Sequence, residues 1–313
     1  MDVGKVNQIL RVAKMYYEMG MGQRDIGEKE KISKSTVSRL LKNAEEMGFV
    51  KITVEKPMYF MADIEEALCR RYGLKKAVVT PLVVNDRDVI LADVCRSAAA
   101  ELPSLIRSDS VVAVAWGRTL TELAGLLPPM KRTGVKVVQI NGGSSRLLYD
   151  TGSDSVLKAF KDAVDGEAYR LAAPAVVDNI FIAEAIKSDS QIRSVIDTAE
   201  NADIGIWSVG KVAKCSILYE LVGFSESDFA RIKKLSDGDV CSHYLNASGK
   251  LADEAFDGRV VAASAEKLRN IPDKVLVAAG ADKADAVRAS LNGGFADYLF
   301  IDEALAKKVL KSS

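Results

Sequence analysis

Three short segments rich in glycine and hydroxyl residues each follow an apolar run. They are Gly117-Arg118-Thr119 after residues 110–116, Asn141-Gly142-Gly143-Ser144-Ser145 after residues 135–140, and Ser208-Val209-Gly210-Lys211 after residues 203–207. Glycine lets backbone N–H groups approach an anion, hydroxyls add donors, and a following helix N-terminus adds partial positive charge. A single turn of this kind is commonly a plain connection, but three of them favour a pocket that binds a phosphate or a polyol.

A second set of polar residues near the N-terminus has the chemistry to contact DNA. Arginine and lysine reach phosphates or guanine edges, and small polar side chains donate to phosphates and bases. The candidate DNA-binding residues are Gln23, Lys34, Ser35, Thr36, Ser38, Arg39 and Lys42. The charge of the surrounding segment also favours DNA binding, because residues 5–42 contain nine basic and four acidic residues, a net charge of +5. The chain as a whole has a net charge of zero, so the remainder is acidic.

The elements that carry these polar residues are predicted as three helices and a strand. Apolar positions at helical spacing predict a first helix over residues 3–19, whose stripe includes Leu10, Tyr16 and Tyr17. A short helix over residues 23–30 follows, and Ser33 is a plausible N-cap for a third that ends before Gly48. Residues 49–55 alternate apolar and polar types, as a strand or wing does. A helical hairpin that docks a partner protein is the alternative interpretation.

The segment DIGEKEKISKSTVSRLLKNAEEMGFVKI resembles the winged helix-turn-helix of the SorC-type sugar-binding regulators, to which the deoxyribonucleoside-operon regulators of bacilli belong. Two positions depart from that pattern. Glu30 stands where an apolar residue is usual, and Lys31 stands where the turn usually has glycine or asparagine. A non-glycine residue with positive φ costs about 1 kcal/mol. The resemblance implies that the third helix enters the major groove of operator DNA.

We call the N-terminal residues 1–56 the head and residues 57–313 the body. In the body, strands and helices alternate. The strands expected with most support are residues 74–80, 110–116, 135–140, 203–207, 274–278 and 297–301. Most are continuous apolar runs, which is typical of parallel strands covered on both faces. We therefore predict a doubly wound α/β domain over residues 57–313 after a winged helix-turn-helix over residues 1–56. A doubly wound sheet binds ligands at the carboxyl ends of its strands.

The body is also similar to the effector domain of the SorC-type regulators, through WGRTL, QINGGSS, WSVG, GDVCSHYLNASGK and VAAGADKADAVRASLNGGFADYLFID. The resemblance implies a domain like the sugar-phosphate isomerases, a phosphorylated sugar as effector, and a homo-dimer or tetramer. The implied effector-binding residues are Gly117, Arg118, Thr119, Asn141, Gly142, Gly143, Ser144, Ser145, Ser208, Gly210, Asp239 and Lys283. Asp239 would accept hydrogen bonds from sugar hydroxyls, and Lys283 would supply charge to a phosphate. A turn-capping role for Asp239 and a surface position for Lys283 are the alternatives.

Other site classes find little support in the sequence. The four cysteines are far apart and His243 is the single histidine, so no metal site, disulfide framework or cofactor is expected. His243 is interpreted as a packing or surface residue on a strand. Trp116 and Trp207 both end expected strands; packing in the core is the default interpretation for both, and a place on the floor of the pocket is the alternative for one of them. No segment resembles a membrane span or a secretory signal, which favours a cytoplasmic protein.

These observations predict a DNA-binding regulator, with a repressor of a carbohydrate or nucleoside operon as the expected role, rather than an enzyme. A sugar-phosphate isomerase-like enzyme is the alternative, because the body resembles one. The sequence offers no convincing acid/base pair for isomerisation, and an isomerase has no need of the fused head.

Overall fold

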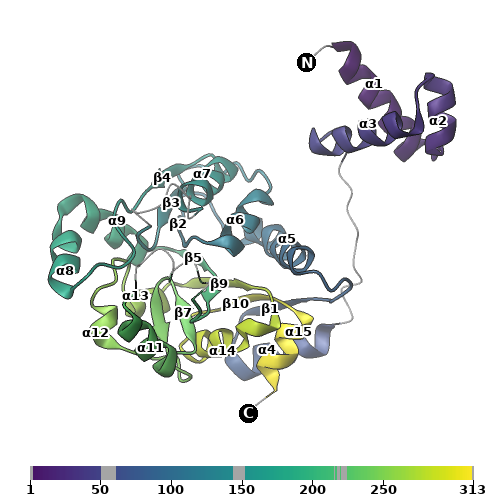
Figure 1. Ribbon diagram of the computed structural model, residues 1–313. Helices are drawn as coiled ribbons and strands as arrows, with labels where there is room; N and C mark the ends of the chain where they lie inside the picture. Colours follow the sequence, from purple (N-terminus) through teal and green to yellow (C-terminus); the bar gives the residue numbers. More distant parts are fainter. Residues whose placement is uncertain are drawn as a thin grey trace. The chain divides into compact units, whose positions relative to one another are not determined.

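The computed structural model describes residues 3–50, 61–143, 152–214, 216, 219 and 224–311. The chain divides into two compact units, Met1–Pro57 and Met58–Ser313 (Figure 1). The strand expected after Phe49 and the predicted domain boundary at Lys56-Pro57 fall within residues 51–60, outside the described residues; so do Ser144 and Ser145. Within the described ranges, no helix has the length and apolar character needed to cross a membrane.

The first unit consists of helices packed around one small core. They are α1 (Val3–Ala13), a π-helical turn η1 (Lys14–Glu18), α2 (Gln23–Glu30) and α3 (Lys34–Glu46). Ser33 caps α3, since its hydroxyl accepts a hydrogen bond from the Thr36 N–H at 3.1 Å. The core is formed by Ile9, Val12, Ala13, Met15, Ile26, Val37, Leu40, Leu41 and Ala44. The predicted stripe of the first helix was therefore wrong in part.

The error in the first helix has a local cause. The α-helix widens to the π-turn at Lys14–Glu18, so Met15 is buried while Tyr16 and Tyr17 stay at the surface. Leu10 is exposed as well, because the buried side of α1 carries Ile9 and Val12. The Tyr17 hydroxyl donates to the Glu45 carboxylate at 2.7 Å, which ties the π-turn to α3.

The two unusual residues between α2 and α3 are both accommodated. Lys31 adopts the left-handed conformation, with φ 57° and ψ 42°, so the turn keeps the geometry that glycine or asparagine provides more readily. Glu30 forms an ion pair with Arg11 of α1, with 2.9 Å between the guanidinium Nη2 and the carboxylate Oε2. A charged bridge to α1 thus stands where an apolar contact was expected.

The second unit is built on a seven-stranded sheet in which every neighbouring pair is parallel. Its order is β1-β10-β9-β5-β2-β3-β4. The strands are β1 (Lys76–Thr80), β2 (Val111–Val114), β3 (Lys136–Gln139), β4 (Glu167–Tyr169), β5 (Ile204–Trp207), β9 (Asp273–Ala278) and β10 (Tyr298–Asp302). The six strands predicted from apolar runs are all present, with ends shifted by one or two residues.

Helices cover both faces of this sheet (Figure 1). One face packs against α5 (Arg87–Leu105), α6 (Arg118–Gly125) and α7 (Ser153–Val164). The other packs against α4 (Ala62–Tyr72), α9 (Ser190–Glu200), α13 (Ala265–Arg269), α14 (Ala284–Asn292) and α15 (Glu303–Leu310). Helix α8 (Ile180–Ser188) precedes α9 and packs against it. The sheet is therefore doubly wound, with a separate apolar core on each side.

A small antiparallel sheet adds a second layer, of which the sequence predicted only the strand that carries His243. It is formed by β6 (Val209–Gly210), β7 (Gly238–Val240) and β8 (His243–Leu245). Helices α11 (Glu226–Leu235) and α12 (Glu254–Asp257) contribute Phe229, Ile232 and Phe256 to the apolar and aromatic contacts around it. A two-residue turn, Cys241-Ser242, joins β7 to β8 with positive φ at both residues, as type I′ hairpin turns require.

The order of the strands locates the crevice in which such sheets bind ligands. After β2 the chain builds β3 and β4 on one side, and then β5, β9 and β10 on the other. Strands β2 and β5 are therefore neighbours at which the direction of winding reverses. Ligands bind at this switch point, outside the carboxyl ends of the strands. Residues 115–119 and Ser208 lie directly there.

Candidate functional site

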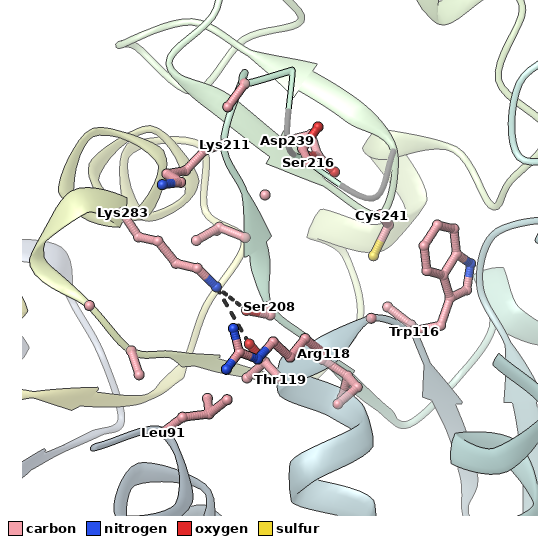
Figure 2. A pocket seen from close by; sticks show the side chains of 18 of the residues that line it. Leu91, Trp116, Arg118, Thr119, Ser208, Lys211, Ser216, Asp239, Cys241 and Lys283 are labelled. Carbon is pink, nitrogen blue, oxygen red and sulfur yellow. Dashed lines mark hydrogen bonds between the residues drawn. The ribbon is translucent and has the colours of Figure 1, made fainter. Parts of the chain in front are cut away.

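A cavity of about 280 Å³ opens at the switch point. Its walls come from the segments after β2, β3, β5 and β9, from the start of α5, and from the small sheet (Figure 2). The predicted residues that line it are Gly117, Arg118, Thr119, Asn141, Ser208, Gly210, Asp239 and Lys283. The fold thus brings together side chains that are up to 166 residues apart in the sequence, between Gly117 and Lys283.

Lys283 is the cation that reaches furthest into this cavity. It lies on the 3₁₀ turn η3 (Ala281–Lys283), and its Nζ is 3.4 Å from the Thr119 hydroxyl and 3.5 Å from that of Ser208 (Figure 2). Burial lowers the pKa of Lys283 to about 8, so the ammonium form still dominates at neutral pH. Among the described residues, no carboxylate lies within ion-pair distance of Nζ. A cation that lacks such a partner is suited to an anionic ligand.

The N-terminus of α6 opens into the same region. Gly117 precedes the helix with φ 119°, a conformation that other residues rarely adopt, and no side chain caps the first turn. The first N–H groups of a helix have no acceptor within it and carry partial positive charge. Together with Thr119, Ser208 and Lys283, they make this end of the cavity electropositive and rich in donors.

The opposite wall carries a carboxyl group. Asp239 of β7 accepts a hydrogen bond from the Ser242 N–H at 3.2 Å, and burial raises its pKa to about 6. A Cβ at position 210 would lie 2.0 Å from Asp239 Oδ1, so only glycine fits beside this carboxyl. Asn141 is buried and donates from Nδ2 to the Ser242 hydroxyl at 2.9 Å. This wall offers acceptors and donors for hydroxyl groups.

Between the two ends the cavity has an apolar side. Trp116 is half-buried there, and its indole N–H donates to the Gly142 carbonyl at 2.8 Å, which fixes the ring. Ile90 and Leu91 of α5 add apolar lining elsewhere in the cavity. Trp207, by contrast, is fully buried in the core and donates to the Phe295 carbonyl. The sequence could not tell these two tryptophans apart, since both follow or end a core strand.

Three further cations, Arg87, Arg118 and Lys211, line the cavity near its mouth. Arg118 is paired with Asp88 at the start of α5. Asp282 pairs with Lys211 and with Arg87, the latter at 3.2 Å from Nη2 to Oδ2. The Lys211 ammonium keeps the pKa of Asp282 below its usual value.

Two predicted residues, Gly142 and Gly143, do not line the cavity. Their N–H groups donate to the Val261 and Ala173 carbonyls, both at 2.9 Å, so the expectation that they donate to a phosphate is corrected. A Cβ on Gly142 would lie 2.5 Å from backbone oxygens of residues 173 and 174. Close packing of the backbone, rather than ligand approach, accounts for this glycine.

Sequence reasoning missed several residues of the cavity wall. Arg87, Ile90 and Leu91 belong to a helix that follows no glycine-rich turn, so no local signal marks them. Gly280 was detectable from the sequence, since it lies two residues beyond the end of β9. Its φ of 100° explains why glycine stands there. Cys241 and Ser242 follow Asp239 closely, but their place in the wall depends on the hairpin that the sequence did not predict.

His243 is a buried residue with satisfied hydrogen bonds, in agreement with its interpretation from sequence. Its Nδ1 lies 2.6 Å from the Asp257 carboxylate and its Nε2 lies 2.9 Å from the Ala263 carbonyl. Burial alone would lower the pKa of His243, but the Asp257 carboxylate outweighs it and the pKa is raised.

In the first unit, the candidate DNA-binding residues of α3 share one side of the helix. Lys34, Ser35, Ser38, Arg39 and Lys42 are exposed, opposite the buried Val37, Leu40 and Leu41. The Ser35 and Thr36 hydroxyls lie 2.8 Å from that of Ser33, within the cap of the helix. Gln23 begins α2 and is half-buried.

Comparison with known proteins connects this architecture to a family. Residues 56–311 match the sugar-binding domain family (Sugar-bind). The deoxyribonucleoside regulator of Bacillus subtilis is 31% identical over 99% of this chain and 99% of its own length. The sorbitol operon regulator of Klebsiella pneumoniae is 24% identical over 98% of each, and the transcriptional regulator LsrR of an Enterobacter strain is 27% identical over 96% of this chain and 92% of its own.

Solved structures agree at the level of the fold. The full-length sorbitol operon regulator SorC from Klebsiella pneumoniae superimposes with a TM-score of 0.78, covering 99% of this chain and 100% of that one at 23% identity. A domain of a sugar-binding transcriptional regulator from Arthrobacter aurescens gives 0.75 over 82% of this chain and 100% of its own, also at 23% identity. The curated relatives named above are transcriptional regulators and not enzymes. The chain therefore belongs to the SorC-type family of sugar-binding transcriptional regulators.

Proposed function

We propose that this regulator binds operator DNA through α3 and is controlled by a phosphorylated sugar held in the cavity at the switch point. The observation that carries the proposal is the position of Lys283, whose ammonium group meets two hydroxyls inside a buried pocket. A phosphate is the group that best uses a cation, hydroxyl donors and a helix N-terminus together. The regulated genes would encode enzymes that break down a carbohydrate or nucleoside, and this protein would repress their transcription.

The two ends of the cavity suggest how the effector is oriented. Its phosphate would lie at the end formed by Lys283, Thr119, Ser208 and the first turn of α6. Its hydroxyl groups would face Asp239, which accepts hydrogen bonds as a carboxylate and would repel a phosphate. The apolar face of a sugar ring packs well against an indole, which is what Trp116 offers.

The effector changes the affinity for DNA only if it binds more tightly to one of two states of the regulator, the state that binds DNA or the state that does not. A homo-dimer or tetramer fits this role, because paired heads match the two half-sites of a palindromic operator. The helix-turn-helix assignment is supported by the Ser33 cap, the left-handed Lys31 turn and the exposed polar side of α3.

Calorimetry tests the phosphate directly. Matched pairs of sugars, such as ribose 5-phosphate with ribose and glucose 6-phosphate with glucose, are titrated into the full chain. A charge-assisted hydrogen bond contributes about 1.5–3 kcal/mol, so removal of the phosphate is expected to weaken binding at least tenfold. Lys283→Gln should reduce this difference, whereas Lys307→Gln on the exposed side of α15 should leave it unchanged.

Equal affinity for both members of the pair that binds most tightly would show that the effector is a neutral sugar or polyol. Treatment of the complex with borohydride adds a second check, since the pocket is proposed to hold its ligand without a covalent bond. A reduced adduct on Lys283 or Lys211 would contradict that part of the proposal.

A further inference from the structure

Among the described residues, four cations line the cavity, and three of them are held by carboxylates that do not line it. Arg118 pairs with Asp88, while Arg87 and Lys211 both pair with Asp282. The side chains of Arg118 and Arg87 are 65% and 77% exposed, so the guanidinium groups lie at the surface although their residues contribute to the wall. Lys283 differs, because its ammonium group points inward to Thr119 and Ser208 (Figure 2).

The ion pairs form one chain around the mouth of the cavity. Asp282 pairs with Lys211, which follows β6 of the small sheet, and with Arg87 at the start of α5. Asp88, the next residue of α5, continues the chain to Arg118 at the start of α6. This series of ion pairs therefore connects four segments of the polypeptide that surround the opening.

These pairs are of a kind that an incoming anion can replace. Asp88 is 80% exposed, and an ion pair between exposed side chains shifts an equilibrium by only about two- to fivefold. A hydrogen bond from arginine to a phosphate in a partly desolvated pocket shifts it by about tenfold or more. Arginine and lysine also have long, flexible stems, which allow the head group to turn inward while the backbone stays in place.

We propose that Asp88 and Asp282 compete with the effector's anionic group for the cations at the mouth and thereby determine which anions the pocket accepts. With no anion bound, Asp88 holds Arg118, and Asp282 holds Arg87 and Lys211. A phosphate takes these cations over, whereas a weakly coordinating anion such as chloride leaves them paired. This inference rests on the proposed function, because it concerns how the same pocket selects a phosphorylated ligand.

Removal of one carboxylate charge tests the competition. Inorganic phosphate is the probe, and its apparent Kd is obtained from the rise in melting temperature of the full chain at constant ionic strength, with chloride as the replaced anion. Asp88→Asn should bind phosphate about two- to fivefold more tightly than the parent chain, because one competitor is gone. Asp282→Asn should change affinity in the same direction.

Matched controls separate this effect from a general loss of negative charge. Asp93→Asn removes a carboxylate from the same helix, where it pairs with Arg96, and Asp285→Asn removes one just after η3, where it pairs with Arg288. Neither residue lines the cavity. Both controls should bind phosphate with the affinity of the parent chain.

A double-mutant cycle then identifies the cation through which Asp88 acts. Arg118→Gln should weaken phosphate binding, and Asp88→Asn should give no further gain in the Arg118→Gln background, since the cation in competition is absent. A gain that persists in that background would show a long-range field effect and overturn the proposal. Weaker binding by Asp88→Asn would overturn it as well, because the carboxylate would then be a positioning group for Arg118.

Failure of this inference is distinguishable from failure of the proposed function. If the parent chain prefers sugar phosphates to sugars but Asp88→Asn and Asp282→Asn bind phosphate no more tightly, the proposed function stands and the competition is refuted. If the parent chain binds neither inorganic phosphate nor sugar phosphates and both variants behave alike, both are refuted. Lys283→Gln, which should weaken phosphate binding in every background, tests whether the signal comes from the cavity.

Discussion

At the scale of single residues, His243 is held in a way that favours the charged imidazole. Its Nε2 lies 2.9 Å from a carbonyl oxygen, to which it can only donate. Its Nδ1 lies 2.6 Å from the Asp257 carboxylate, which accepts. Two acceptors require two N–H groups, and only the protonated ring has both. The hairpin that carries Asp239 is thus anchored by an ion pair between the buried His243 and the partly exposed Asp257.

This arrangement predicts a dependence of stability on pH. The raised pKa of His243 means that its contribution to the free energy of unfolding is fully present below the ordinary value of 6.5 and is lost as pH rises through the raised pKa. His243→Gln cannot titrate, so its melting temperature should fall less than that of the parent chain as pH rises above 6.5. Calorimetric melting curves from pH 6 to pH 8.5 measure the difference. Asp239 and Lys283 titrate in both chains, so parallel curves would contradict the charged state assigned to His243.

At the scale of elements, α3 is the proposed DNA-reading helix. Arg39 and Lys42 lie on its exposed side, and each phosphate contact made by such a cation contributes about 0.9 to the slope of log affinity against log salt. The double variant Arg39→Ala/Lys42→Ala should therefore bind operator DNA more weakly and with a salt slope reduced by about 2. Sugar-phosphate binding should be unchanged, since the head has a core of its own.

A matched variant on the body controls for the loss of two positive charges. Lys307→Ala/Lys308→Ala removes two exposed lysines from α15 and should leave the salt slope as it is. Filter-binding or anisotropy titrations at several salt concentrations provide the comparison. An unchanged slope in the α3 variant would remove the basis for α3 as the recognition helix.

The elements also show how far the sequence could predict this molecule. Continuous apolar runs identified six of the seven strands of the large sheet, because strands covered on both faces need apolar residues at every position. The three-residue edge strand β4, Glu167–Tyr169, has no such run and was missed. The strand ends then gave Gly117, Thr119 and Ser208 as wall residues. Most of the small sheet escaped prediction, because strands of two or three residues have no periodicity to detect. The prediction that Gly142 contacts the ligand was wrong for a physical reason. A glycine required by close backbone packing looks the same in the sequence as a glycine that lies against a ligand.

Residues contributed by a different part of the chain were beyond prediction in the same way. Arg87 and Lys211 pair with Asp282 only because the fold brings the start of α5 and the end of β6 close to η3. No sequence motif indicates these ion pairs. The likeness of the body to sugar-phosphate isomerases and the wing after Phe49 stay predictions.

At the scale of the whole molecule, the described residues of the head and those of the body each form apolar clusters of their own. The head's core lies within residues 9–50, and the body's clusters begin at residue 61 and continue to residue 310. A truncated chain of residues 58–313 is therefore expected to fold, to stay oligomeric and to bind the same ligands as the full chain. Its melting temperature should lie within about 2–4 °C of that of the body in the full chain, the shift that about 1 kcal/mol gives a domain of this size.

Calorimetry of the truncated and full chains, with size-exclusion chromatography for the oligomeric state, tests this independence. Aggregation of residues 58–313, with ligand binding recovered only in the full chain, would show that the head is needed for the body to fold.

The position of the cavity at the switch point has a consequence for how such regulators diverge. The side chains that stabilise the sheet lie in two cores on its faces, whereas the cavity is lined mainly by the ends of strands and the loops beyond them. Substitutions at the rim, such as those at Arg87 or Lys211, remove little apolar packing and so have little effect on the stability of the sheet. Under the proposed function, related regulators would therefore exchange one effector for another in small steps while the sheet itself stays unchanged.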